Sequence, residues 1–442
     1  MNIQLSEHFT YRKLLSFTFP SVVMLVFTSV YGVVDGFFVS NFVGKTSFTA
    51  VNFIMPFLMI LGSVGFMFGT GGGALIAKTL GEGKEEKAGN LFSMIVYVSI
   101  ACGVFLSVFG ILFVRPIAAL LGAEGQLLED CVTYGRIILA ALPAYILQYE
   151  FQCLFATAGK PALGLYVTAA AGVTNMVLDA LFVAVFHWGI PGAAGATLFS
   201  QCVGGGIPLI YFARPNKSLL KLGRTQFLGR ELLKACGNGS SELMSNISMS
   251  IVSMLYNVQL LKYAGEDGVA AYGVLMYVSM IFLAVFIGYS VGTAPVIGYQ
   301  YGAKNHGELK SLRKKSLLLI GIFALFMFSA AYFLAIPLSN LFVGYDRELL
   351  ALTIRGFSIF SYCFLFSGFA IFGSSFFTAL NNGLISASIA FLRTLVFQIA
   401  AVLILPLFWG VDGIWLSIVA AEVMAVVVTV FFLKSQREKY GY

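Results

Sequence analysis

Charged side chains are scarce in this sequence. Asp, Glu, Lys and Arg make up 11% of its 442 residues, whereas apolar types make up 59%. A soluble domain usually has about 25% charged residues. So little charge cannot cover a water-soluble particle of this size, and we therefore expect lipid to surround much of the chain.

Residues for soluble chemistry are also few. The three histidines form no serine–histidine–aspartate pattern, so the sequence offers no catalytic constellation and is not expected to be an enzyme. It contains no Walker A motif, which excludes a built-in ATP motor. The six cysteines are scattered without a C-x-x-C or Cys/His cluster, so we expect neither a disulfide framework nor a zinc site, and no cofactor.

Long apolar runs make up most of the sequence. Runs of roughly 20 residues match a hydrocarbon core of about 30 Å when they are helical, and helices satisfy every backbone group internally in lipid. Twelve such spans are predicted, near 14–40, 49–77, 90–113, 131–158, 162–186, 190–212, 235–262, 269–297, 314–336, 352–379, 385–407 and 412–433. The sequence therefore predicts an all-α polytopic membrane protein. The first run is too long for a signal peptide and is expected to stay in the protein.

The basic residues fall on one side of these spans. With the N-terminus placed in the cytoplasm, the inside segments hold 20 of the 27 Lys and Arg residues, and the outside loops hold four. This asymmetry follows the positive-inside rule and explains the net charge of +7 without a nucleic-acid partner. Both termini are expected to be cytoplasmic.

The second half of the sequence repeats the first. A shift of 221 residues places Gly71, Ala74 and Gly81 on Gly292, Pro295 and Gly302, and Trp188, Gly189 and Gly192 on Trp409, Gly410 and Gly413. Six spans per half keep both halves in the same orientation, so a pseudo-two-fold along the membrane normal should relate them. The expected units are an N-terminal lobe (1–212), a C-terminal lobe (235–442) and a cytosolic linker (213–234), in part an amphipathic surface helix.

Five acidic residues fall within or at the start of the apolar spans: Asp35, Glu150, Asp179, Glu242 and Glu422. An ionisable group in a membrane helix costs several kcal/mol and is a functional hypothesis by default. The alternative is that each acid is neutralised by an internal arginine, such as Arg136 or Arg393, and only braces the fold.

Asp35 and Asp179 are the strongest of these candidates. Asn175 and Asp179 share one helix face at i, i+4, and amide and carboxylate oxygens are ligands for a hard cation such as Na⁺. Two acids facing one cavity repel each other, so one holds a proton or both hold a cation. The repeat places Tyr256 and Ala400 opposite these two acids. A coupling-ion site at Asp35, Asn175 and Asp179 is thus expected once, in the N-terminal half.

The remaining acids are secondary candidates. Glu422 corresponds to Gln201 in the repeat, so both are expected to face the interior, either as a brace or as cavity lining. Glu242 lies near a helix start. Glu150 belongs to a polar patch with Gln148 and Gln152 that is also suited to line a cavity.

At Asp35 and the Asn175/Asp179 pair the chain resembles the MATE (multidrug and toxic compound extrusion) transporters, in particular their prokaryotic DNA-damage-inducible-type branch. The resemblance covers essentially the whole chain and includes VVDGFFVSNFVG, GTGGGALIAKTLGEGKEEKAGNLF, GAEGQLLEDCVTYGRIILAALP, FATAGKP and WGIPGAAGATLFSQ.

The resemblance adds roles for single residues. In that branch the N-lobe coupling site uses an acid of the first helix and an Asn-x-x-x-Asp pair of the fifth, which match the three residues above. It also implies that Thr197 and Tyr134 belong to the site. Other branches rely on a glutamate in the seventh helix; Glu242 lies closer to the start of that helix, so the N-half site is expected to be primary. Bending of the first helix is expected near Gly32 and Gly36.

The function implied is multidrug efflux by antiport against H⁺ or Na⁺, from a monomer with a cavity between two lobes. The substrates expected are organic cations or amphipathic compounds, and the location a bacterial plasma membrane. One alternative is a flippase or exporter for a lipid-linked precursor or specialised metabolite, whose anionic headgroup would need bases such as Arg136, Arg355 and Arg393 in the cavity. A channel or a membrane scaffold is the other.

Overall fold

The computed structural model describes residues 4–344 and 346–442, apart from the side chains of four residues between 40 and 48. The first half contains α1 (Tyr11–Phe38), η1 (Val39–Val43), α2 (Lys45–Met67), η2 (Phe68–Gly72), α3 (Gly73–Gly81), α4 (Glu85–Leu120), α5 (Gly125–Ala140), α6 (Leu142–Thr157), α7 (Pro161–Asp179), η3 (Ala180–Val185) and α8 (Gly189–Ala213). The second half contains α9 (Gly229–Gly302), α10 (His306–Val343), α11 (Arg347–Phe360), η4 (Ser361–Cys363), α12 (Phe364–Ala379), α13 (Gly383–Phe391), η5 (Leu392–Val396), α14 (Phe397–Ile404), α15 (Pro406–Ser435) and the short α16 (Arg437–Tyr440). Here η1, η2, η3 and η5 are π-helical turns, and η4 is a 3₁₀ turn.

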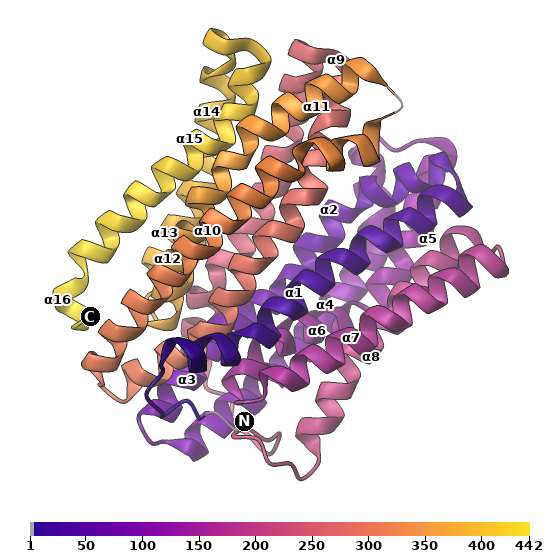
Figure 1. Cartoon of the computed structure of the whole chain (residues 1–442). Coiled ribbons are helices and arrows are strands. Elements are labelled where there is room, and N and C mark those ends of the chain that lie inside the picture. Colours follow the sequence, from indigo (N-terminus) through magenta and orange to yellow (C-terminus); the bar gives the residue numbers. More distant parts are fainter. Residues whose placement is uncertain (1–3, 345) are drawn as a thin grey trace.

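These elements form twelve membrane spans. Ten helices of the described residues are long and apolar enough to cross a bilayer. The pair α5 and α6, bent by 59°, adds one more. Gly265 breaks α9 with φ 64° and ψ −155°, which divides this 74-residue element into two arms and completes the twelve. The prediction of an all-helical polytopic protein is therefore confirmed (Figure 1).

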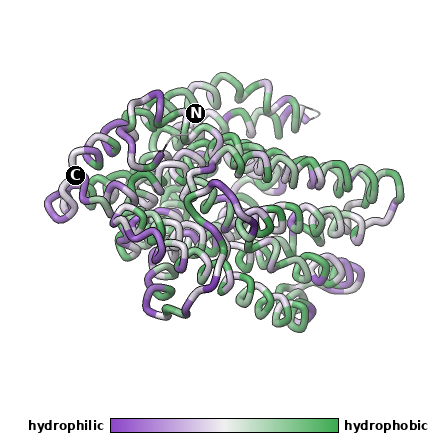
Figure 2. Tube along the Cα trace, turned by 90° about the horizontal axis from the view of Figure 1, so that it is seen from below, coloured by the Kyte–Doolittle hydropathy of each residue, from purple (hydrophilic) through white to green (hydrophobic). Residues whose placement is uncertain are grey.

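Several helices run beyond the predicted spans. The span predicted at 314–336 belongs to α10, which begins at His306 and ends at Val343. The added turns carry Lys310 and Arg313. Apolar length reports only the part of a helix within hydrocarbon, whereas the helix itself continues into the polar interface. Figure 2 shows apolar residues along the helices and many of the hydrophilic ones toward the end where the C-terminus lies.

Loop geometry repeats between the two halves. Left-handed backbone conformations occur at Gly44 and Gly265, at Gly83 and Lys304, and at Gly189 and Gly410, each pair separated by 221 residues, and at Gly159 and Asn381, one residue further apart. Positive φ is uncommon outside glycine. Its recurrence at matching positions shows that the two six-helix lobes share their connections as well as their helices.

The lobes meet closely at the end of the molecule that carries the termini, which we call the terminal end. A Cβ on Gly71 would lie 2.0 Å from the carbonyl oxygen of Ala235, and one on Gly239 would lie 1.9 Å from that of Met67. Small residues allow helix backbones to approach this far. Residues from both lobes thus form a seam in which no side chain separates the helices.

A second pair of contacts extends this seam. A Cβ on Gly81 would lie 2.0 Å from the carbonyl oxygen of Tyr299, and one on Gly302 would lie 2.0 Å from that of Lys78. The two contacts are mates under the 221-residue repeat. The seam, defined by Gly71, Gly81, Gly239 and Gly302, therefore follows the pseudo-two-fold axis.

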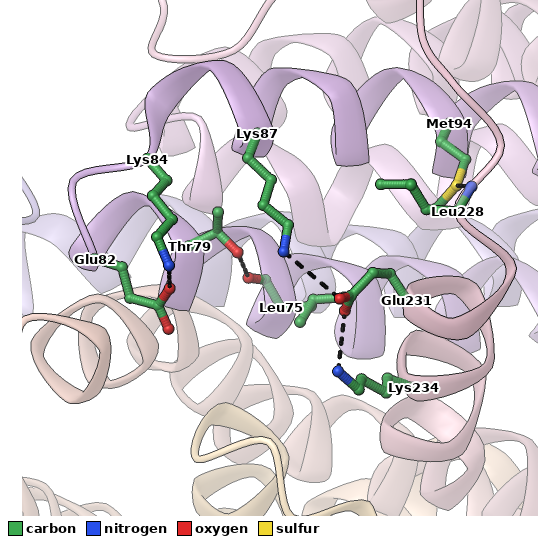
Figure 3. A network of polar contacts seen from close by, with 9 residues as sticks. All are labelled: Leu75, Thr79, Glu82, Lys84, Lys87, Met94, Leu228, Glu231 and Lys234. Carbon is green, nitrogen blue, oxygen red and sulfur yellow. Dashed lines mark hydrogen bonds and ion pairs between the residues drawn. The ribbon is translucent and has the colours of Figure 1, made fainter.

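Polar contacts also cross between the lobes at the terminal end. Glu231, in the first turn of α9, lies 3.5 Å from Lys87 Nζ of α4 and 3.4 Å from Lys234 Nζ (Figure 3). Because both lysines are about half exposed, this ion network adds little stability. It does mark where the start of the second lobe rests on the first.

The segment before α1 crosses to the second lobe. Leu5 and Phe9 are buried in its apolar core. The Phe9 amide donates to Glu308 Oε1 at 2.9 Å, and Gln300 Nε2 donates to the Leu5 carbonyl at 3.0 Å. The start of the N-terminal lobe is therefore fastened to α9 and α10.

The last residues of the linker, 229–234, form the first turns of α9, and no separate surface helix precedes them within residues 214–228. Residues 214–228 lie in an irregular path along α4. The Gly223 amide donates to Ser93 Oγ at 3.0 Å, Thr225 Oγ1 donates to the Asn90 carbonyl at 2.8 Å, and the Leu228 amide lies 3.2 Å from a methionine sulfur of α4 (Figure 3). These side-chain partners replace the hydrogen bonds that a helix would supply.

Candidate functional site

Four helices of the first lobe bring the predicted coupling residues together. Asp35 on α1 lies within hydrogen-bonding reach of Asp179 and Asn175 on α7 and of Thr197 on α8. Tyr134 on α5 is buried and lies within reach of Thr197. The cluster of Asp35, Tyr134, Asn175, Asp179 and Thr197, which we call the acid cluster, is thus assembled from segments far apart in the sequence.

Local structure positions each member of the cluster. Asn175 and Asp179 occupy one face of the last turns of α7, and both are nearly fully buried. Asn175 Nδ2 donates to Thr197 Oγ1 at 3.5 Å, and Thr197 Oγ1 donates to the Ala193 carbonyl at 3.2 Å. Ser200 Oγ donates to the Ala171 carbonyl at 2.8 Å and joins α8 to α7.

Four carboxylate and amide oxygens of the acid cluster lack a hydrogen-bond partner in the part of the chain that the structure describes. Asp35 Oδ1, both carboxylate oxygens of Asp179 and Asn175 Oδ1 are buried and have no hydrogen-bond partner among the described residues. Among the described residues, no Lys or Arg forms an ion pair with Asp35 or Asp179. Two carboxylates in contact in a low-dielectric interior cannot both stay charged without a compensating proton or cation. The geometry is suited to hold one H⁺ or one small hard cation.

A row of aromatic hydroxyls extends from the cluster. Tyr31 lies one turn before Asp35, and Gln148 Nε2 donates to its hydroxyl at 3.3 Å. The hydroxyls of Tyr145 and Tyr149 lie 3.1 Å apart. Our sequence reasoning did not find Tyr31, although its i−4 spacing from an intramembrane acid was a usable signal.

The proposed hinge glycines are not required for packing. A Cβ on Gly32 or Gly36 would meet no heavy atom within 4 Å. Close helix contact therefore does not explain glycine at these two positions. Backbone freedom beside Asp35 is the remaining physical account, and a hinge in α1 stays a prediction.

Glu150 lies apart from the acid cluster. It is completely buried on α6, within reach of Ser99 of α4, and neither carboxylate oxygen has a hydrogen-bond partner among the described residues. Both polar side-chain atoms of Gln152 are also unpartnered there. Glu150 and Gln152 thus face the interior of the first lobe, whereas Gln148 of the same polar patch donates to Tyr31.

The acids of the second lobe have a cationic partner. Arg393 Nε lies 2.9 and 3.0 Å from the two carboxylate oxygens of Glu422, and its Nη2 lies 2.8 Å from one of them. Glu242 is near enough to Arg393 for an electrostatic attraction between the two side chains. Glu422 is therefore held in a brace, whereas its repeat mate Gln201 is buried with an unpartnered oxygen.

The arginines needed for an anionic headgroup do not converge. Arg393 is engaged by Glu422. Arg355 is exposed and paired with Asp412, with Nε 2.8 Å from one carboxylate oxygen. Arg136 is exposed as well. No pair of these three bases shares a site in the described structure.

Replacing Arg393 by Met is expected to destabilise the second lobe. Removing one partner of a buried ion pair leaves an uncompensated charge, which costs about 3–5 kcal/mol. Thermal unfolding of the purified protein should show a clear fall in Tm. The double variant Arg393→Met/Glu422→Leu should regain most of it, and Arg355→Met, at an exposed pair, should change little. Equal losses in Arg393→Met and Arg355→Met would contradict a bracing role.

Comparisons with known proteins agree with this architecture. The model of the MatE family matches the chain twice, over residues 20–181 and 243–404. The multidrug export proteins MepA of Staphylococcus haemolyticus and of Staphylococcus aureus strain NCTC 8325 are 22% and 23% identical to it. The alignments cover 98% and 96% of this chain and 95% and 94% of those proteins.

Solved structures resemble the whole chain. One is described as the outward-facing conformation of a multidrug resistance MATE family transporter of the MOP superfamily. It has a TM-score of 0.93 and 22% identity, with 99% of this chain and 98% of that chain covered. A MATE in the straight conformation has a TM-score of 0.93 and 21% identity, with 98% and 97% covered. At this level of identity the likeness establishes the fold.

Proposed function

The chain belongs to the MatE family, and from that premise we propose that it is a secondary multidrug exporter that expels cationic or amphipathic organic compounds in exchange for H⁺ or Na⁺. Two family matches, one in each half, and relatives named as multidrug export proteins of nearly the same length support this function. Members of the family are transporters rather than enzymes.

The observation that carries the antiport proposal is the set of buried oxygens in the acid cluster that lack a hydrogen-bond partner among the described residues. Asp35, Asn175 and Asp179 supply them, and no basic side chain of the described residues neutralises the two acids. Such a set binds a proton or Na⁺ reversibly, because the charge-neutral state is reached only when the ion is present. A permanently paired acid, such as Glu422 with Arg393, lacks this property.

The transport cycle follows from the two-lobe geometry. In the described state the seam closes the terminal end, and a substrate cavity between the lobes would open at the other end. Binding of the ion at Asp35 and Asp179 changes the hydrogen bonds around Thr197 and Tyr134 and bends α1 near its hinge glycines. The drug then leaves, the lobes rock, and the ion is released inside. Coupling requires only that drug and ion favour different states.

The basic residues indicate which end of the molecule faces the cytoplasm. The terminal end carries most of the 27 Lys and Arg residues and therefore faces the cytoplasm of a bacterial plasma membrane. The closed seam then makes the described state outward-facing. The functional units are the lobes 1–212 and 235–442, joined by the linker 213–234. A single chain holds the whole acid cluster, so a monomer is sufficient.

Export of an anionic lipid-linked precursor is the weaker candidate. Such a headgroup needs several bases in one cavity, whereas Arg355 and Arg136 are exposed and Arg393 is engaged by Glu422. The acid cluster instead favours a substrate that competes with a cation.

Efflux measured in inverted membrane vesicles tests the proposed function. Ethidium or norfloxacin uptake into the vesicles should follow an imposed gradient of either H⁺ or Na⁺, which also identifies the coupling ion. Vesicles without the protein are the control. If neither gradient moves either compound, multidrug antiport is wrong and a specialised metabolite exporter becomes the better account.

A further inference from the structure

A groove at the terminal end of the first lobe combines charge with lipid-facing apolar surface. It has a volume of about 700 Å³ and is lined by residues from the start of α7, from the end of α8 and from the beginning of the linker. Three basic residues line it, Lys160, Arg214 and Lys217, and no acidic residue does. We call it the interfacial groove.

The apolar side of the groove faces outward. Tyr166, Ile207 and Ile210 line it, with 69%, 42% and 54% of their surfaces exposed. The membrane spans of both helices end within this groove, at Pro161 and Ala213. Its basic rim is therefore at the depth of lipid headgroups, and its apolar side is at the depth of acyl chains. The two tyrosines lining it, Tyr166 and Tyr211, suit that boundary.

The basic rim is held by a fixed turn. Asn216 Nδ2 donates to the carbonyls of Tyr211 and Arg214 at 3.1 and 3.0 Å, and Asn216 Oδ1 accepts from the Ser218 amide at 2.9 Å. Arg214 precedes Asn216 in the sequence and Lys217 follows it. The third base, Lys160, is the N-cap residue of α7, whose helix dipole adds partial positive charge on the same side.

A second groove differs from the interfacial groove in having no charged lining. It measures about 390 Å³ and is lined only by residues such as Leu318, Ile322 and Phe369, from α10 and α12. No charged residue lines it, so any acyl chain fits there equally well. Charge complementarity distinguishes the interfacial groove from this ordinary lipid-facing surface.

We propose that the interfacial groove binds one anionic phospholipid. Its phosphate would lie among Lys160, Arg214 and Lys217, and one acyl chain would lie along Ile207 and Ile210. The same two helices carry Asn175, Asp179 and Thr197 further along. A bound lipid would thus anchor α7 and α8, and with them three of the five residues of the acid cluster, to the inner membrane surface. This site is independent of which drug or ion is transported.

Native mass spectrometry of the full chain in detergent tests the site. Phosphatidylglycerol and phosphatidylcholine with identical acyl chains are titrated in parallel, and phosphatidylglycerol should bind more tightly. Arg214→Gln/Lys217→Gln should weaken phosphatidylglycerol binding about 30-fold, which corresponds to about 2 kcal/mol for two bases near the surface. The matched control is Lys221→Gln/Arg224→Gln, which removes the same charge from exposed linker positions outside the groove.

The outcomes separate a built site from diffuse attraction. Unchanged binding in the control pair together with a loss in the groove pair supports the proposal. Equal loss in both pairs, or no preference for phosphatidylglycerol, overturns it. Displacement by free glycerol phosphate at the same concentration also overturns it, because the acyl chain would then contribute nothing. Lys160→Gln is the second variant if the groove pair fails to unfold cooperatively.

Discussion

Asp179→Asn and Asp35→Asn are each expected to abolish gradient-driven drug efflux. Either change keeps the shape of the side chain but removes a carboxylate whose oxygens have no other neutralising partner. Allosteric coupling between two ligands is typically worth about 1–3 kcal/mol, roughly a 5- to 150-fold change in affinity, and without it the ion gradient no longer drives the drug. Vesicle uptake of ethidium under the effective gradient measures this directly, with the amount of folded protein checked in the same membranes.

Glu150→Gln is the matched control for these two variants. Glu150 is as deeply buried as Asp179, lies in the same lobe and also lacks a hydrogen-bond partner among the described residues, but it faces Ser99 rather than Asp35. Efflux should therefore persist in this variant. Efflux that is lost in Glu150→Gln but survives in Asp179→Asn would move the coupling site to α6, and survival in all three would direct attention to Glu242.

Gly239→Ala is expected to open the seam at the terminal end. The added Cβ would lie 1.9 Å from the Met67 carbonyl oxygen, and a backbone atom cannot move aside as a flexible side chain can. Overpacking of this kind costs about 1–3 kcal/mol. The cost applies only to the state in which the terminal end is closed, so the equilibrium should shift away from that state. Transport should fall because one of the two states is depleted.

Gly237→Ala provides the control for the seam. This glycine lies two residues before Gly239 on α9, and a Cβ there would meet no heavy atom within 4 Å. Spin labels placed at Glu86 and Lys310, both exposed at the terminal end, report the separation of the lobes. The distance distribution should lengthen in Gly239→Ala and stay unchanged in Gly237→Ala. An unchanged distribution in both variants would show that the seam does not set the closed state.

The sequence was most informative where lipid constrains it. Apolar run length predicted twelve spans, because every span must cross the same hydrocarbon thickness. Asp35 and the i, i+4 pair Asn175 and Asp179 were recognisable because an acid in a membrane helix is costly without a purpose. The structure brings these three residues together with Thr197 and Tyr134, which only the family resemblance had indicated.

Features that depend on partners distant in the chain were not predictable. Glu422 could equally have been a brace or a cavity residue until Arg393, 29 residues earlier on another helix, was found beside it. The linker had the composition of a cytosolic connector and was expected to be in part a surface helix, but hydrogen bonds to Ser93 and Asn90 of α4 determine its path. Neither pairing leaves a signature at fixed spacing.

The symmetry of the seam also bears on how such a chain arises. Gly81 and Gly302 make equivalent contacts, and Gly71 against Gly239 is matched by Gly292 against Thr18. Two copies of one six-helix unit would meet through the same contacts, so a duplicated and fused gene needs no new interface. Fusion instead frees each copy to change alone. The acid cluster in one half and the Arg393–Glu422 brace in the other are the kind of divergence that an identical pair of subunits could not have kept.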